Sequence, residues 1–218
     1  MQKQYDFIRT PVEDCQQCPR LYNFLQELKK KYPKYHNRAV PAFGAENPDL
    51  LIVGLAPGMH GANASGRPFT GDFAGILLYK TLYEFRFSNK FESLHNNDGL
   101  MLDRVRITNA VKCLPPQNKP VSTEINTCNG FLTEELQTLK PSAVILALGT
   151  IAHKSVIKAL KLKQKDYKFS HNTAHPLPDD RYMVDSYHCS RYNTQTRRLT
   201  EQGFREVFHN IKNLIEQQ

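Results

Sequence analysis

Two uninterrupted apolar runs, residues 50–55 and 143–148, constrain the fold of this chain most strongly. Each run is six residues long, which suits a strand and falls far short of the ~20 apolar residues that span a bilayer. A strand that is apolar at every position has to be covered on both faces, as the strands of a parallel sheet are. The two runs therefore predict buried parallel strands and no membrane-spanning segment.

Amphipathic helices alternate with strands along the rest of the chain. Further strands are expected over residues 104–112 and 181–187, and helices over residues 20–32, 74–85, 122–139, 150–160 and from Thr200 onward. This alternation predicts an α/β fold, a three-layer α/β/α arrangement with a central four-stranded parallel sheet. The length of 218 residues favours a single domain over residues 1–218.

Ligand sites in such folds lie outside the carboxyl ends of the strands, and a glycine-rich segment, residues 54–72, follows the first of them. The segment matches no dinucleotide or nucleoside-triphosphate motif. Its five glycines let the backbone approach a ligand closely, and Phe69 offers a flat face for stacking. Asp72 is its only acid, and that carboxylate either serves a site or caps the helix that follows.

Polar residues also follow the second and fourth expected strands. The Asn109 amide can donate and accept, as reading a base edge requires, although an Asn at a strand end can also simply turn the chain. His188 could likewise be structural. It is followed by a basic loop with one aromatic ring, a mixture that suits phosphate contact and stacking: Arg191, Tyr192, Arg197 and Arg198.

The overall charge favours a polyanionic partner. Lys and Arg number 29 against 21 Asp and Glu, a net charge of +8, while 40% hydrophobic residues exclude a wholly disordered chain. Six lysines between residues 154 and 168 form a solvated face that could lie along DNA. The first ten residues, MQKQYDFIRT, lack the apolar stretch of a secretory signal, so a cytoplasmic protein is expected.

Two groups of residues could bind a metal. The cysteines number five, and without an export signal a disulfide scaffold is not expected. Cys15 and Cys18 form C-x2-C, Cys113 and Cys128 form a wider pair, and Cys189 stands alone. Two such pairs can enclose a metal centre, although scattered buried thiols remain the alternative. His171 and His175 are four residues apart, but Pro176 and neighbouring turn residues argue against a helix that presents both to a metal.

Three segments together resemble the iron–sulfur uracil-DNA glycosylases, most of all their type-5 (B-type) branch: GLAPGMHGANASGRPFTGD, ITNAVKC and SYHCSRYNTQTRRLT. The resemblance covers roughly residues 11–215 and includes the cysteine spacing, a C-x2-C near the start and two more cysteines about fifteen residues apart. It implies a [4Fe-4S] cluster held by Cys15, Cys18, Cys113 and Cys128. It also implies a four-stranded parallel sheet between helices.

The resemblance further implies an activity and roles for the site residues. Relatives in this family excise uracil from DNA by hydrolysing the N-glycosidic bond with water, and the type-5 branch also removes some deaminated purines. By motif position, Phe69 would stack on the flipped base and Asn109 would hydrogen-bond its edge. His188 would face the base oxygen that gains negative charge, and Asp72 would orient or activate water. The base would also contact the first motif: Gly54, Leu55, Ala56, Pro57 and Gly58.

Two details of the motifs refine the expectation. Residues 55–58 lack the polar residue that other branches carry there, which is a type-5 trait, and no Lys lies in the motif loops as a nucleophile, so a monofunctional enzyme without a lyase step is expected. Cys189 stands where many relatives have proline, which predicts a less rigid loop.

Other functions remain open at this stage. An iron–sulfur electron carrier is one, although ferredoxin-type sequences pack their cysteines more closely. A non-catalytic DNA-binding protein stapled by zinc or by an iron–sulfur cluster is the other. The favoured expectation is a monomeric DNA-repair glycosylase.

Overall fold

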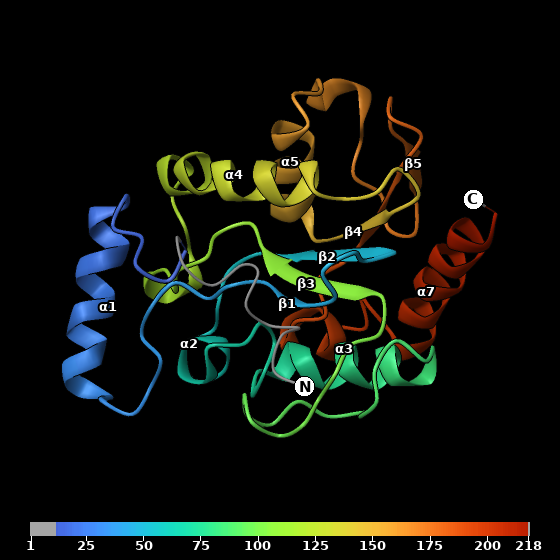
Figure 1. Cartoon of the computed structure of the whole chain (residues 1–218). Helices are drawn as coiled ribbons and strands as arrows, with labels where there is room; N and C mark the ends of the chain where they lie inside the picture. The colour runs from blue at the N-terminus through green and yellow to red at the C-terminus, as the bar shows by residue number, and fades with distance from the viewer. Residues whose placement is uncertain (1–11, 218) are drawn as a thin grey trace.

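The computed structural model describes residues 12–217, which form one six-stranded sheet flanked by helices (Figure 1). The strand order is β1-β3-β2-β4-β6-β5. The four central strands are parallel: β2 (Leu50–Gly54), β3 (Val105–Asn109), β4 (Val144–Leu148) and β6 (Tyr182–Ser186). All four lie where the sequence predicts strands, so the α/β class and its parallel centre are confirmed.

The expected strand count of four is wrong, because an antiparallel strand is added at each edge. β1 (Phe43–Gly44) pairs with β3, and β5 (Ala174–Pro176) pairs with β6. These strands span two and three residues, too few for an alternating pattern to be visible in the sequence. Pro176 also lacks a backbone N–H and suits only an edge position.

Helices cover both faces of the sheet. α4 (Ser122–Gln137) and α5 (Thr150–Ala159) lie on one face, and α3 (Phe73–Glu84) and α7 (Glu201–Glu216) lie on the other (Figure 1). Along β2, Leu50 and Ile52 pack into the α3–α7 side while Leu51 and Val53 pack into the α4–α5 side. Burial on both faces explains why the strand is apolar throughout.

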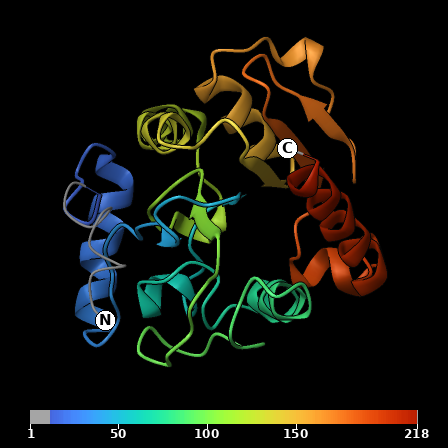
Figure 2. The ribbon, with the colours of Figure 1, turned by 45° about the vertical axis from the view of Figure 1, so that its right-hand side comes forward.

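One helix stands apart from these two layers. α1 (Pro19–Lys31) lies at the opposite end of the molecule from α7 (Figures 1 and 2). Its buried stripe packs against the segment that follows β3 and against α4, and consists of Leu21, Leu25 and Leu28. None of the helices within residues 12–217 has the length and apolar character needed to cross a membrane.

The expected loops contain short helices that the sequence pattern does not reveal. α2 (Ala62–Ser65) lies inside the glycine-rich segment, and α6 (Arg191–Gln195) lies in the basic loop. Two 3-10 turns, η1 (Pro116–Asn118) and η2 (Gln164–Asp166), lie in other connections. The expected cap of the last helix is present, because the Thr200 hydroxyl accepts a hydrogen bond of 3.0 Å from the Gly203 N–H.

A buried ion pair holds the glycine-rich segment against the loop after α3. The Arg67 guanidinium donates two hydrogen bonds to the Asp98 carboxylate, at 3.0 and 2.6 Å, and both side chains are under 10% exposed. The same guanidinium lies over the Phe43 ring, 4.9 Å from its centroid. Burial raises the pKa of Asp98, but the hydrogen bonds from Arg67 and from backbone N–H groups outweigh burial and hold that pKa well below its ordinary value.

Replacing Asp98→Asn should lower the free energy of unfolding by about 3–5 kcal/mol at pH 7, because Arg67 then stays buried without its counter-charge. A carboxyl pKa that is lowered on folding stabilises the protein above pH ~4, and this stabilisation is lost as the pH falls further. Urea unfolding between pH 3 and 7 measures the difference between wild type and variant, which should shrink below pH ~4. A difference that is constant with pH would contradict this role of the charge.

Candidate active site

A cavity of about 510 Å³ opens at the carboxyl edge of the sheet. Three polar side chains of its lining come from separate parts of the chain: Asp72 ends the glycine-rich segment, Asn109 ends β3 and His188 follows β6. The structure thus brings together three side chains that are far apart in the sequence. The volume lies within the range of ~300–1,000 Å³ that is usual for small-molecule sites.

The first motif forms part of the wall. Leu55, Ala56 and Gly58 line the cavity, whereas Gly54 and Pro57 do not. Gly54 is needed at its position, since a Cβ there would overlap both the Asn109 amide oxygen and the Phe69 ring. The absence of a side chain at residue 54 therefore lets these two groups reach the cavity.

Phe69 is held in a strained conformation beside His188. Its φ of +56° is uncommon for a residue with a bulky side chain, and such strain clusters at functional sites. The preceding residue is fixed, because the buried Tyr79 hydroxyl donates a 2.8 Å hydrogen bond to the Pro68 carbonyl. The Phe69 ring is nearly parallel to that of His188, with centroids 5.9 Å and planes 25° apart.

The Asp72 carboxylate does not cap the helix that follows it. Asp72 occupies the N-cap position of α3, but its side chain makes no capping hydrogen bond to that helix. It instead accepts a hydrogen bond of 3.1 Å from the Ala62 N–H and another from the Gly58 N–H. Burial raises the pKa of Asp72, and these two bonds oppose the rise by stabilising the charged form.

Two glycines make room for this carboxylate. A Cβ at Gly58 or at Gly61 would overlap the Asp72 carboxyl group. The glycine-rich segment thus wraps its backbone around the acid, and the interpretation of Asp72 as a simple helix cap is wrong.

Asn109 and His188 present unpaired polar groups to the cavity. Asn109 is 3% exposed, yet neither its amide nor the His188 ring hydrogen-bonds any other group within residues 12–217. Burial lowers the pKa of His188 to about 4, so the ring is neutral at pH 7 and carries one N–H. Both groups face the cavity, so a ligand bound there can complete their hydrogen bonds.

The basic loop lies at the mouth of the cavity. Arg191 lines it and stacks on Phe73, its guanidinium carbon 4.8 Å from the ring centroid. Tyr192 is 70% exposed beside it. Arg197 and Arg198 are exposed but do not line the cavity, and Arg198 lies 4.3 Å over the Tyr187 ring.

The opposite wall of the cavity consists of residues that the sequence pattern does not predict for the site. Thr150 and Ile151, at the start of α5, line the cavity together with Asn118 from η1. The Gly149-Thr150 pair at the end of the third strand is the signal that could have located this wall. Asn118 follows a proline-rich turn and gives no comparable signal.

Four of the five cysteines line one small cavity of their own beside α1, although the first pair and the second pair lie far apart along the chain. Cys15 and Cys18 precede α1, Cys113 follows β3, and Cys128 lies on α4. None forms a disulfide. Burial raises the pKa of Cys113, and the negative charges of Cys128, Cys15 and Cys18 add to the rise, so four thiolates here require a cationic partner.

These residues fit a metal cluster. Four thiols from two pairs provide the donor set that iron–sulfur centres use, and the Lys112 N–H already donates a hydrogen bond of 3.2 Å to the Cys128 sulfur. Cys189 is elsewhere. It is fully buried in the core on the α3–α7 side.

Comparison with known proteins shows the family to which this chain belongs. The model of the uracil DNA glycosylase superfamily matches residues 41–212, which include the site residues Asp72, Asn109 and His188. The chain belongs to this superfamily. It is 42% identical to a type-5 uracil-DNA glycosylase of Thermus thermophilus, over 95% of this chain and 96% of the relative.

More distant members of the superfamily agree. A type-5 uracil-DNA glycosylase of Pyrobaculum aerophilum is 38% identical over 93% of this chain and 90% of its own length. A type-4 uracil-DNA glycosylase of Saccharolobus solfataricus is 28% identical over 93% of this chain and 84% of its own. The superfamily is α/β, in agreement with the sheet described above.

The low pKa of His188 leads to a prediction on its protonation. The ring should stay neutral down to pH ~5, because burial disfavours the imidazolium. Between pH ~6.5 and about 4 the unfolded chain would bind a proton here that the folded chain does not, so this residue makes the protein less stable as the pH falls. Long-range ¹H–¹⁵N NMR of the folded protein measures the titration. A midpoint near 6.5 would contradict the burial of this ring.

Proposed function

We propose that this protein is a monofunctional DNA-repair enzyme that hydrolyses the N-glycosidic bond of uracil, and of some deaminated purines, in DNA. One observation carries the proposal. An amide and a neutral imidazole that have no hydrogen-bond partner among residues 12–217 share a cavity with a carboxylate bound by backbone N–H groups, in a chain of the uracil-DNA glycosylase superfamily. A non-catalytic DNA-binding protein or an electron carrier has no use for such a cavity.

Base recognition follows from the inner wall. A glycosylase extrudes its target base from the stack and recovers the cost through stacking and hydrogen bonds in the pocket. The Phe69 ring offers an apolar face to the extruded base. The Asn109 amide oxygen can accept a hydrogen bond from the uracil N3–H, and its NH₂ group can donate one to a neighbouring carbonyl of the base. Cytosine has no N3–H and does not match this pairing.

His188 acts on the leaving group. As the C1′–N bond breaks, negative charge develops on the uracil, and a donor aimed at its carbonyl oxygen stabilises that charge. A neutral imidazole supplies one N–H without requiring a counter-ion. The low pKa of His188 keeps the ring neutral at pH 7, so the ring donates its one N–H to the base without placing a charge in the buried site.

Asp72 acts on the sugar and on water. Its charged form is supported by the Ala62 and Gly58 N–H groups, which leaves a carboxylate lone pair for a water molecule. The same negative charge stabilises positive charge at the anomeric carbon. Water then adds to that carbon and its proton passes to Asp72. Asp72 releases this proton to solvent and the departing uracil anion takes one up, so the products are the neutral free base and an abasic sugar.

The loop at the mouth of the cavity suits DNA contact. Arg191, Arg197 and Arg198 supply charges for phosphates, and the exposed Tyr192 ring can enter the gap that the extruded base leaves in the duplex. The expected monomeric state and cytoplasmic location are part of the same proposal.

We infer that the four clustered cysteines hold a [4Fe-4S] cluster rather than zinc. The four thiols line one cavity, and a set of four cysteine ligands serves both zinc and iron–sulfur centres. The resemblance of the cysteine spacing to that of the iron–sulfur uracil-DNA glycosylases favours the cluster. Such a cluster would join α1 to the centre of the chain, a structural contribution.

Replacing Asp72→Asn should lower single-turnover release of uracil from a uracil-containing oligonucleotide by about 10²–10⁴-fold, because the variant keeps the shape but loses the charge. Binding of the same oligonucleotide should change little. Release is followed by alkaline cleavage of the abasic strand and gel electrophoresis. The matched control is Asp166→Asn, at an exposed acid on η2.

Two outcomes would contradict this account. Full activity of Asp72→Asn would show that the carboxylate takes no part in the reaction. Absence of uracil release by the wild-type protein with its metal centre intact would remove the glycosylase proposal as a whole.

Replacing Cys113→Ala or Cys128→Ala should abolish the broad absorbance near 400 nm and lower the soluble yield, because loss of a thiolate opens the centre that joins distant segments. The matched control is Cys189→Ala, which should keep the absorbance since that thiol is buried in another part of the core. Loss of absorbance in the Cys189 variant alone would overturn the ligand assignment.

A further inference from the structure

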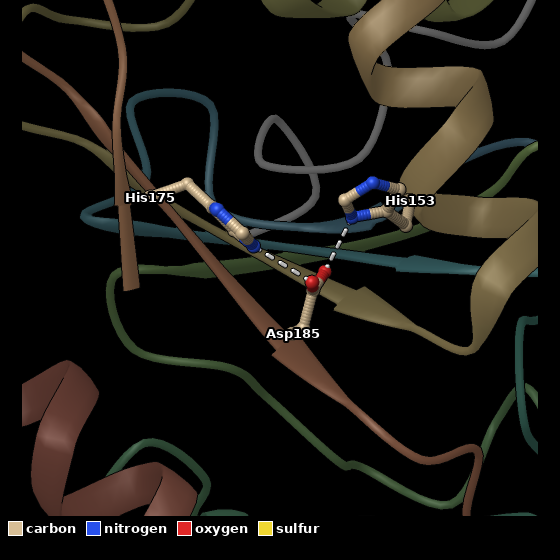
Figure 3. Close-up of side chains that lie close together, drawn as sticks. All are labelled: His153, His175 and Asp185. Atoms are coloured by element: carbon tan, nitrogen blue, oxygen red, sulfur yellow. Dashed lines mark hydrogen bonds and ion pairs between the residues drawn. The ribbon is translucent and has the colours of Figure 1, made fainter. Parts of the chain in front are cut away.

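A buried cluster of two histidines and one aspartate lies apart from both sites described above. His153 comes from α5, His175 from β5 and Asp185 from β6, and both rings point at the carboxylate (Figure 3). His153 Nδ1 lies 2.8 Å from Asp185 Oδ1, and His175 Nε2 lies 2.8 Å from Oδ2. All three residues are at most 9% exposed, and none lines the active-site cavity.

The hydrogen-bond partners of His153 do not match a neutral ring. Its Nε2 lies 3.0 Å from the Tyr167 carbonyl oxygen, and its Nδ1 faces the Asp185 carboxylate. Both partners are acceptors, whereas a neutral imidazole carries one N–H. If the single proton lies on Nε2, the Nδ1 lone pair points at a carboxylate oxygen, and either a second proton or a metal cation has to lie between them.

We propose that His153 Nδ1, His175 Nε2 and the Asp185 carboxylate bind a zinc ion. Two imidazoles and one carboxylate are a donor set that zinc accepts, with water in the fourth position. Their ligand atoms already lie within 4.8 Å of one another, and all three residues are buried. Magnesium and calcium are less suited, because they prefer sites made of oxygen ligands.

The surrounding groups orient these ligands for a metal. The Tyr167 carbonyl fixes the His153 proton on Nε2, which frees Nδ1, and a carbonyl on the outer ring nitrogen is the usual partner of a metal-bound histidine. The Ser170 N–H donates a hydrogen bond of 3.3 Å to Asp185 Oδ2 and so orients the carboxylate. On binding, the proton between His175 and Asp185 leaves Nε2, and that ring keeps one proton on Nδ1.

The ion would fasten the edge of the sheet to its covering helix. β5 has only three residues and pairs with β6 alone, so few backbone hydrogen bonds fix its position. Asp185 also lies three residues before His188 on the strand that leads into the active site. Zinc would therefore stabilise the segment from which His188 emerges, without touching the substrate.

The test begins with the metal content of the whole, unmodified protein after growth with zinc and dialysis. We expect about one zinc per chain by inductively coupled plasma mass spectrometry. Zinc K-edge X-ray absorption should show nitrogen and oxygen neighbours with imidazole scattering and no sulfur. Zinc with sulfur neighbours would place the ion at the cysteines, and less than ~0.1 zinc per chain after incubation with zinc chloride would show no site. Either result overturns the proposal.

Variants then assign the ligands. Asp185→Asn and His153→Gln should each remove the zinc while keeping the absorbance near 400 nm, and the matched control His95→Gln, at an exposed histidine, should keep the zinc. Chelation of zinc in the wild-type protein should lower Tm by about 10 °C, and added zinc chloride should restore it. Zinc retained in both cluster variants would overturn the ligand assignment even if Tm responds.

Discussion

The parallel register of the four central strands is the constraint on which the site depends. Gly54 of β2 is paired with Asn109 of β3, and Leu148 of β4 is paired with Ser186 of β6, so the strands end together. Each connecting loop therefore leaves the sheet at the same edge. Residues separated by more than a hundred positions meet there, while the sheet itself stays apolar and rigid.

Further contacts hold the glycine-rich segment in place beside the sheet. The Arg67–Asp98 ion pair and the Tyr79–Pro68 hydrogen bond tie it to the loop after α3 and to α3 itself. These contacts keep Phe69 in a conformation that it would not adopt alone. The free energy of these contacts thus holds the Phe69 ring and the Asp72 carboxylate in position at the cavity.

The sequence alone predicts the apolar strands, the longer helices and the residues that converge on the cavity, because a buried parallel strand and a glycine-rich turn have strong local patterns. It does not predict β1 or β5, which are stabilised by pairing with a neighbour and not by their own composition. The partner of Asp72 is equally hidden, since an acid before a helix has the same local sequence whether it caps that helix or binds Ala62. His175 lies near His171 in sequence, yet its neighbour in space is His153.

The missing side chain at Gly54 has a consequence for how this pocket can vary. The floor beneath Asn109 and Phe69 is main chain, and main chain cannot be trimmed or enlarged by a single substitution. A substitution that changes the size of the pocket without disturbing this floor has to be made in the walls, for example at Ala56 or Ile151, which line the cavity. The backbone of the sheet therefore sets the depth of the pocket, and the side chains of its walls set its width.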